Sequence, residues 1–320
     1  MLISASDNLK TRTTSKKSRS LEVETGSFAS HENLSSDYSK LVVATFNIRY
    51  AVGSFLITGS ILRRIGIKRP KRRGKLVERH LQVAARALRS NRIMPAPDII
   101  ALQEADKGTR RAGEHNIARE FARLLSMNYA QTMMDFPRDA PVAARKWWLD
   151  FEERIRPDDP GSMGVALLSR TPLIEAQRID LPYFECAWRP RIAIRARVPF
   201  ADRELHIFNS HIDTHATIAN QLAQHMAVLD LADNESSDTP IIITGDFNTL
   251  TNESCTQMRC LLEARGYTTP FPNNTATWRA GFVRLHTDWI FMRNLRALRW
   301  GVARPLGVSD HWPVWVEVAN

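Results

Sequence analysis

Short apolar runs alternate with stretches of helical periodicity from Leu41 to Val318. Apolar runs bounded by turn-forming residues predict strands, and apolar residues spaced three or four apart predict amphipathic helices. The expected strands cover residues 41–46, 98–102, 165–168, 192–198, 205–209, 241–244, 289–292 and 314–318, and the expected helices cover 75–88, 116–125, 218–231 and 255–263. Strands and helices interspersed in this way are typical of one layered α/β domain.

The first 40 residues lack this periodicity and are rich in Ser, Thr, Asn and Lys. Such a composition buries too little apolar surface to fold, so we expect a disordered tail over 1–40 and one domain over 41–320. Leu2–Ser6 is too short for the apolar core of a secretory signal. We expect a cytoplasmic protein, although the basic, Ser- and Thr-rich start leaves an organellar transit peptide open.

The three cysteines do not indicate a disulfide framework or a zinc site. Cys186, Cys255 and Cys260 are scattered and form no pair with zinc-ligand spacing. We therefore expect free, buried thiols in a reducing compartment. The chain has no uninterrupted apolar run of about 18 residues, so we expect no transmembrane segment.

Composition adds a local excess of positive charge. The chain has 320 residues, of which 43% are hydrophobic and 24% charged, which excludes a fibrous or wholly disordered protein. The net charge is +10, yet twelve Lys and Arg and a single acid, Glu78, fall between Arg63 and Arg92. This window carries +11 and the rest of the chain −1, so the charge indicates a local contact with an anion.

Polar and ionisable residues stand at the ends of several expected strands. They are Asn47, Glu104, His211, Asp246 and Asn248, each just after a strand, and Asp288, Asp310 and His311, each just before one. Strand ends are where α/β folds build sites, because the sheet fixes the backbone while the loops stay open. Singly, each residue is more simply explained as a turn former, a cap or a half-buried histidine. Together, four carboxylates and two imidazoles suit oxygen-ligated Mg²⁺ and general acid–base catalysis.

Five segments, in this order, resemble the endonuclease/exonuclease/phosphatase superfamily, which has the deoxyribonuclease-I-like fold. They are Phe46-Asn47-Ile48-Arg49, Leu102-Gln103-Glu104, Asn209-Ser210-His211-Ile212-Asp213, Gly245-Asp246-Phe247-Asn248 and Ser309-Asp310-His311. The resemblance spans residues 41–318. It implies a four-layered α/β sandwich, in which two mixed β-sheets pack together and helices cover their outer faces.

The resemblance also implies a metal site. Glu104 matches the principal Mg²⁺ ligand, and Asn47 and Asp310 match residues beside the metal. Mn²⁺ is expected to substitute for Mg²⁺.

Catalytic roles are implied in the same way. Asp246 matches the residue that orients or deprotonates the attacking water, and Asn248 matches the amide that contacts the scissile phosphate. His311 matches a histidine polarised by a buried carboxylate, here Asp288. His211 matches a second histidine near the phosphate.

Two insertions stand apart from the motifs. Residues 51–74 are apolar first and cationic second, and three interpretations remain: a solvated loop, a grip on nucleic-acid phosphates, or a peripheral contact with an anionic membrane. Residues 133–159 contain Trp147 and Trp148 among mixed charges, which is more typical of a packed surface helix than of a base-stacking platform.

The expected activity is Mg²⁺-dependent hydrolysis of a phosphodiester by attack of water, with nucleic acid as the first substrate to test. One alternative is a hydrolase of phospholipids or small phosphate esters, as in sphingomyelinase-like and inositol-phosphatase-like relatives. The other is a non-catalytic binding protein on the same fold. The presence of Glu104, Asp246 and His311 disfavours this last alternative.

Overall fold

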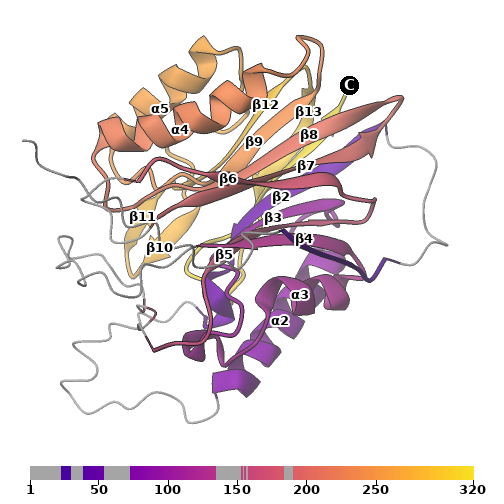
Figure 1. Ribbon diagram of the computed structural model, residues 1–320, viewed down its shortest axis with the longest axis vertical. Helices are drawn as coiled ribbons and strands as arrows, with labels where there is room; N and C mark the ends of the chain where they lie inside the picture. The colour runs from indigo at the N-terminus through magenta and orange to yellow at the C-terminus, as the bar shows by residue number, and fades with distance from the viewer. Residues whose placement is uncertain are drawn as a thin grey trace, which may run out of the picture.

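Two β-sheets stack face to face, and helices cover the outer face of each (Figure 1). The computed structural model describes residues 23–29, 39–53, 73–134, 153, 155, 158–183 and 190–320. Figure 1 shows helices α2 and α3 on one side of the stacked sheets and helices α4 and α5 on the other. The expected four-layered α/β sandwich is therefore confirmed.

The larger sheet has seven strands. In spatial order they are β1 (Glu24–Ser27), β4 (Asn128–Met133), β5 (Gly164–Ser169), β3 (Ile99–Gln103), β2 (Lys40–Asn47), β14 (Val314–Ala319) and β13 (Arg296–Val302). Strands β2 and β3 run parallel, and the other neighbours are antiparallel. Parallel neighbours need a crossover connection, which helix α2 supplies.

The smaller sheet repeats this plan with five strands. In spatial order they are β12 (Asp288–Arg293), β9 (Ile241–Asp246), β8 (Arg203–His211), β7 (Ile192–Phe200) and β6 (Ile174–Asp180). Strands β8 and β9 run parallel and are connected through helix α4. A separate hairpin, β10 (Trp278–Ala280) with β11 (Val283–Leu285), precedes β12.

Four α-helices and two single-turn 3-10 helices lie in the described residues. They are η2 (Arg49–Ala51), α2 (Arg73–Arg89), η3 (Arg110–Ala112), α3 (Ile117–Leu125), α4 (Ile218–Asp233) and α5 (Asn252–Ala264). Asn116 and Thr217 cap the starts of α3 and α4 by accepting backbone hydrogen bonds. Thr251 and Ser254 form a reciprocal capping box at the start of α5. These caps explain why the helices begin where they do.

The core has three apolar layers because the central strands are buried on both faces. On β2, Val43 points between the two sheets, whereas Ala44 and Phe46 point toward α2 and α3. On β9, Ile242 points between the sheets and Ile243 points toward α4 and α5. Near-continuous apolar runs are the sequence pattern of such strands. The polar residues that follow these runs are therefore carried into the interior.

All the expected strands and helices of the domain are present, with ends shifted by a few residues. Strands β1, β4, β6, β10, β11 and β13 were not expected. The prediction of a disordered tail is wrong for residues 24–27, which pair with β4 as an antiparallel edge strand. The Glu24 carboxylate holds them there by accepting from Lys107 and from the Tyr129 hydroxyl.

Other expectations have mixed outcomes. Cys255 is free and buried as expected, and Cys260 is free but exposed. Among the described residues, none of the helices combines the length and apolar character needed to cross a bilayer. Most of the insertions over 51–74 and 133–159, and Cys186, lie outside the described residues.

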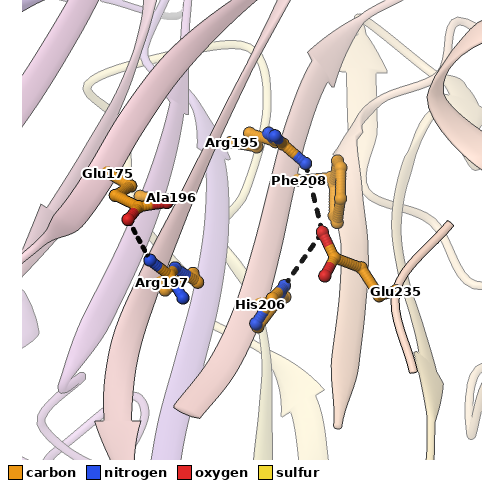
Figure 2. A pocket seen from close by; sticks show the side chains of 7 residues that line it. All are labelled: Glu175, Arg195, Ala196, Arg197, His206, Phe208 and Glu235. Carbon is orange, nitrogen blue, oxygen red and sulfur yellow. Dashed lines mark hydrogen bonds and ion pairs between the residues drawn. The ribbon is translucent and has the colours of Figure 1, made fainter. Parts of the chain in front are cut away.

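The outer face of the smaller sheet carries a polar hollow over β6, β7 and β8 (Figure 2). Arg195 pairs with Glu235 at 3.1 Å, and Arg197 pairs with Glu175 at 2.5 Å. His206 lies 3.4 Å from Glu235 as well. Because its cations already have acidic partners, this hollow holds little net charge to attract a ligand.

Candidate active site

The carboxyl end of β9 is the centre of the candidate site. Asp246, its last residue, lies opposite His211 of the parallel strand β8 and opposite Asp288 of the antiparallel strand β12. Gly245 precedes it with φ +144°, and a Cβ atom there would lie 1.9 Å from the Ser210 carbonyl oxygen. Glycine is therefore needed for β8 and β9 to approach this closely. The register of three strands thus brings three expected residues to one place.

Asn47 joins this cluster from the larger sheet. It is the last residue of β2, and its amide nitrogen donates to Glu104 Oε1 at 3.0 Å and to Asp246 Oδ2 at 2.9 Å. Glu104 follows β3 with φ +51°, a left-handed conformation that ends the extended backbone of the strand. One amide therefore holds carboxylate oxygens from both sheets side by side. Hard oxygen donors of this kind suit a divalent cation such as Mg²⁺.

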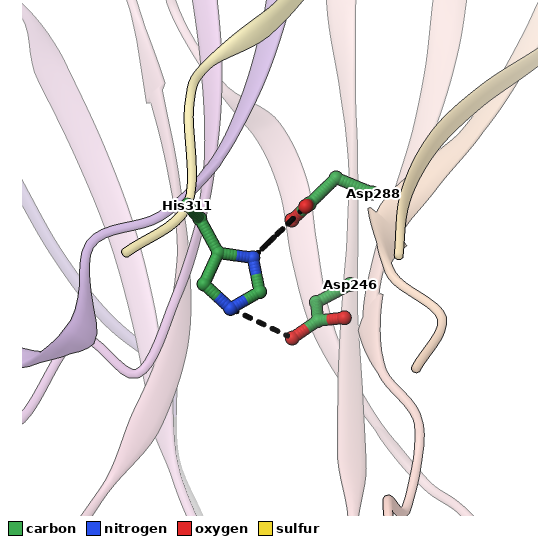
Figure 3. A group of neighbouring side chains, drawn as sticks. All are labelled: Asp246, Asp288 and His311. Atoms are coloured by element: carbon green, nitrogen blue, oxygen red, sulfur yellow. Dashed lines mark hydrogen bonds and ion pairs between the residues drawn. The ribbon is translucent and has the colours of Figure 1, made fainter. Parts of the chain in front are cut away.

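His311 forms the second arm of the cluster (Figure 3). Its Nδ1 lies 2.9 Å from Asp288 Oδ2, and its Nε2 lies 3.9 Å from Asp246 Oδ2. Burial alone would lower the pKa of His311, but the negative charges of Asp288 and Asp246 outweigh burial and raise the pKa to about 10. The ring is therefore protonated at neutral pH. Thr287 donates its hydroxyl to Asp288 Oδ2 at 2.8 Å, which fixes the carboxylate behind the ring.

Asp246 is a carboxylate whose ionisation is made costly by its surroundings. Burial, together with the charge of Asp288, raises the pKa of Asp246 to about 7, although His311 and a hydrogen bond from Asn47 act in the opposite direction. A group with a pKa near neutrality can both accept and release a proton. The ligand atoms of Asp246, Asp288 and His311 lie within 4.8 Å of one another, so the cluster contains a candidate acidic metal site.

Asp310 faces a different set of partners. Its Oδ2 forms an ion pair with Arg49 at 3.1 Å and accepts a hydrogen bond from the Trp278 indole nitrogen at 3.0 Å. Ser309 links it to the rest of the site, because its hydroxyl lies 2.8 Å from the Asn47 carbonyl oxygen and 3.3 Å from Asp310 Oδ1. Ser309 therefore connects Asp310 to Asn47, and Arg49 offsets the charge of Asp310.

His211 and Asn248 line the cluster on the β8 side. His211 Nε2 lies 3.5 Å from Asp246 Oδ2, and one guanidinium nitrogen of the buried Arg191 lies 3.2 Å from Nδ1 and 3.3 Å from Nε2 of the same ring. An arginine can only donate, so the ring offers it a nitrogen acceptor. Asn248 has φ +50°, and its backbone N–H donates to Asp246 Oδ1 at 3.0 Å. Apart from Asp310, each site residue predicted from the sequence contacts Asp246 either directly or through one intervening side chain.

Three further buried residues shape the site and were not among the expected ones. Arg49 and Arg191 supply the positive charges just described. Asn209 connects the two sheets: its amide nitrogen donates to the carbonyl oxygens of Leu102 at 2.9 Å and Ala166 at 2.8 Å. Arg49 and Asn209 belong to the motif segments, so their positions in those segments were the available signal.

The fold and this cluster together define a hydrolase that acts on phosphoric esters with the help of a metal ion. A sequence model of the Endonuclease/Exonuclease/phosphatase family matches residues 44–311, which is most of the chain. The chain therefore belongs to that family, and it is a metal-dependent phosphoric ester hydrolase.

Solved structures share the fold at low sequence identity. An endonuclease/exonuclease/phosphatase from Beutenbergia cavernae DSM 12333 is 17% identical, with a TM-score of 0.60 over 88% of this chain and 72% of that one. D. rerio TDP2 complexed with single strand DNA product is 16% identical, with a TM-score of 0.54 over 88% and 100%. ANGEL2, a 2',3'-cyclic phosphatase, is 11% identical, with a TM-score of 0.56 over 87% and 95%. A search of curated proteins found none that matches.

Proposed function

We propose that the protein hydrolyses a phosphodiester with the help of Mg²⁺ and that its substrate is a nucleic acid. The observation that carries the proposal is the meeting of Glu104 and Asp246 on the Asn47 amide, beside the protonated His311. The likeness to D. rerio TDP2 complexed with single strand DNA product supports nucleic acid as the substrate class.

Glu104, Asn47 and Asp310 would hold the metal ion, because each offers an oxygen donor at the buried cluster. His311 is held through Nδ1 by Asp288, and its role here is at the phosphate. When bound, a divalent ion neutralises charge on a non-bridging phosphate oxygen. Mn²⁺ would serve in place of Mg²⁺. Arg49 adds a fixed positive charge beside Asp310.

Asp246 is the residue that accepts a proton from the attacking water. Its two oxygens are held in place, Oδ2 by the Asn47 amide and Oδ1 by the backbone N–H of Asn248. Both hydrogen bonds favour the ionised carboxylate, which opposes the effect of burial on its pKa. A base that is oriented and poised near neutral pH contributes about 10²- to 10⁴-fold to rate.

His311 is the residue that stabilises charge developing on the phosphate. Asp288 keeps the ring protonated and fixes its orientation, so that Nε2–H faces the Asp246 side of the cluster. His211, backed by Arg191, and the side-chain amide of Asn248 complete the set of phosphate contacts from the β8 side. Donors that are fixed in place before reaction are the most effective form of charge stabilisation.

The proposal is tested by hydrolysis assays with the purified full chain. Bis-p-nitrophenyl phosphate, single-stranded DNA, RNA, a 2',3'-cyclic nucleotide and sphingomyelin are assayed with Mg²⁺, with Mn²⁺ and with chelator. We expect metal-dependent cleavage of a nucleic acid. Asp246→Asn and His311→Gln should each lower kcat by about 10²-fold or more.

Asp202→Asn, an exposed carboxylate on the β7–β8 turn, is the matched control and should keep full activity. Wild-type rates in Asp246→Asn would refute the assignment of the base. Cleavage of sphingomyelin but of neither nucleic acid would refute the substrate class.

A further inference from the structure

The β10–β11 hairpin is fastened to the chain segment that carries Asp310. The Trp278 indole donates to the Asp310 carboxylate at 3.0 Å, and the Arg279 backbone N–H donates to the Asp310 carbonyl oxygen at 2.9 Å. The Trp312 backbone N–H donates to the Thr277 carbonyl oxygen at 2.7 Å. Any ligand held by the hairpin is therefore held next to the candidate active site.

Three arginines surround the Trp312 ring beside this hairpin. The guanidinium carbons of Arg279, Arg284 and Arg304 lie 5.0, 5.9 and 4.4 Å from the ring centroid, within the range of cation–π contacts. Arg279 comes from β10, Arg284 from β11, and Arg304 from the segment after β13. Three separate stretches of chain thus converge on one aromatic side chain.

These three positive charges lack acidic partners within the part of the chain that the structure describes. Arg284 donates to the backbone carbonyl oxygens of Gly281 and Val283, and Arg304 donates to that of Ala276. Partial burial, followed by the charge of Arg284, lowers the pKa of Arg304. The paired arginines of Figure 2 show the contrasting arrangement. A cluster of guanidinium groups without counter-charge is suited to bind phosphate groups.

Phe282 is exposed at the tip of the same hairpin. It occupies the two-residue turn between β10 and β11, and 95% of its surface is accessible. Gly281 precedes it with φ +58°, which this tight turn requires. An aromatic ring held out by a short hairpin, next to a group of arginines, combines two components that bind single-stranded nucleic acid: a stacking surface and positive charge.

We propose that this surface, defined as Arg279, Phe282, Arg284 and Arg304, binds the single strand that flanks the cleaved bond. The arginines contact phosphates of the flanking nucleotides, and Phe282 stacks on an unpaired base. The inference rests on the proposed function, because it names how the same site recognises its substrate. It also predicts that a strand with exposed bases binds better than a duplex.

The arginines are tested by measuring the binding of a fluorescein-labelled 15-nucleotide single-stranded DNA to the full chain. Binding is measured by fluorescence anisotropy without added metal. Arg284→Gln/Arg304→Gln should weaken binding about tenfold and reduce the slope of log affinity against log salt by about 1.4, since each contact with a single strand contributes about 0.7. Arg296→Gln, an exposed arginine at the far end of β13, is the matched control. Equal binding by the double variant and this control would overturn the role of the arginines.

Phe282 is tested by exchanging it for a non-aromatic and an aromatic residue. Phe282→Leu should weaken binding of the oligonucleotide by about fivefold or more, and Phe282→Tyr should restore it, because stacking needs a flat ring. An abasic strand of the same length should bind the wild type and Phe282→Leu equally. Undiminished oligonucleotide binding by Phe282→Leu would overturn the stacking role of Phe282. Tighter binding of the wild type to vesicles of phosphatidylserine and phosphatidylcholine than to the oligonucleotide would overturn it as well.

These measurements separate failure of the inference from failure of the proposed function. Binding is measured without metal and needs no turnover, whereas the proposed function stands or falls on hydrolysis. Thermal unfolding of each variant is recorded in parallel, and unchanged midpoints are expected because Phe282, Arg284 and Arg304 are exposed. Binding loss at an unchanged midpoint supports the surface.

Discussion

The positive charge of Arg49 offsets part of the energetic cost of burying carboxylates at the site. Its guanidinium lies 3.1 Å from the Asp310 carboxylate, and both side chains are almost fully buried. The charges of Asp310 and Glu104 outweigh the cost of burial and raise the pKa of Arg49 further above its usual value. Asp310 would otherwise be a buried anion close to other acids, so Arg49 stabilises the folded site as well as its charge balance.

Removing Arg49 should therefore destabilise the fold. In Arg49→Met, Asp310 loses its ion pair while staying buried, and the free energy of unfolding should fall by about 3–5 kcal/mol, measured by urea denaturation. Arg49→Lys keeps the charge and should lose less. The double variant Arg49→Met/Asp310→Asn should recover part of the loss. A single variant as stable as the wild type would show that the pair is not a structural element.

His225 makes a prediction about pH and stability. This fully buried ring packs edge-on against Phe247, and burial lowers its pKa to about 3 from an ordinary value of 6.5. Below pH 6.5 the unfolded chain takes up a proton that the folded protein excludes, so the free energy of unfolding falls as the pH drops from 6.5 toward 3. The contribution of His225 is about 2 kcal/mol between pH 7 and pH 5.

His225→Leu should flatten that dependence, as measured by urea denaturation at pH 7, 6 and 5. His286, whose pKa burial lowers to about 4, keeps contributing in both proteins and serves as the internal reference. Stability curves for the wild type and His225→Leu that stay parallel from pH 7 to pH 5 would contradict the assignment.

Strand register is the property of the elements on which the site depends most. Asp246 meets His211 and Asp288 because β9 is paired in fixed register with β8 on one side and β12 on the other. A shift of one residue would turn the Asp246 side chain to the opposite face of the sheet. Gly245 permits this register, since any Cβ atom at that position would overlap the Ser210 backbone.

Gly245→Ala should therefore separate β8 from β9. We expect a loss of several kcal/mol in the free energy of unfolding and a fall of about 10²-fold or more in kcat, because Asp246 moves from its place. Gly307→Ala is the matched control, since a Cβ atom there meets nothing within 4 Å. Urea denaturation and hydrolysis are measured for both. Equal behaviour of the two variants would exclude a special role for Gly245.

The elements also explain what could be predicted from the sequence and what could not. Buried central strands such as β2 and β9 are apolar on both faces, so their runs and the polar residues after them stand out. Strands β6 and β13 are edge strands with many exposed positions, and β1 has no apolar run, so periodicity misses them. Their pairing is determined by partners distant in the sequence.

The same reasoning applies to the site. Asp246 and Glu104 could be predicted because each follows an apolar strand within a specific motif. The contact between Arg49 and Asp310 joins residues 261 positions apart, and nothing in either local sequence indicates the pair. Arg191 likewise reaches His211 only because β7 and β8 are neighbours. Contacts across sheets become visible only with the tertiary structure.

The molecule as a whole gathers buried acids at one end of two stacked sheets, which predicts stabilisation by metal. Glu104, Asp246, Asp288 and Asp310 are all buried there. A divalent ion at 100 times its dissociation constant adds about 2.7 kcal/mol to the free energy of unfolding. For a domain of this size we expect Mg²⁺ or Mn²⁺ to raise the Tm by about 5 to 10 °C.

Adding a chelator should reverse this rise in Tm. The Tm is measured by thermal unfolding without substrate. Glu104→Gln should abolish most of the rise, whereas Asp202→Asn should leave it unchanged. An undiminished shift in Glu104→Gln would mean that the metal binds elsewhere, for example among Asp246, Asp288 and His311.

Each sheet carries one parallel pair, β2 with β3 and β8 with β9, flanked on both sides by antiparallel strands. The molecule is thus built as two similar halves, and each half ends in an incomplete set of site residues. Sliding one half past the other by a single residue, about 3.4 Å, would part the Asn47 amide from Asp246. The Asn209 side chain on β8 donates hydrogen bonds to the opposite sheet, and these oppose such a displacement. The apolar packing between the two sheets therefore also keeps the site residues aligned. We expect a substitution that loosens this packing to lower the activity before it lowers the stability of the fold.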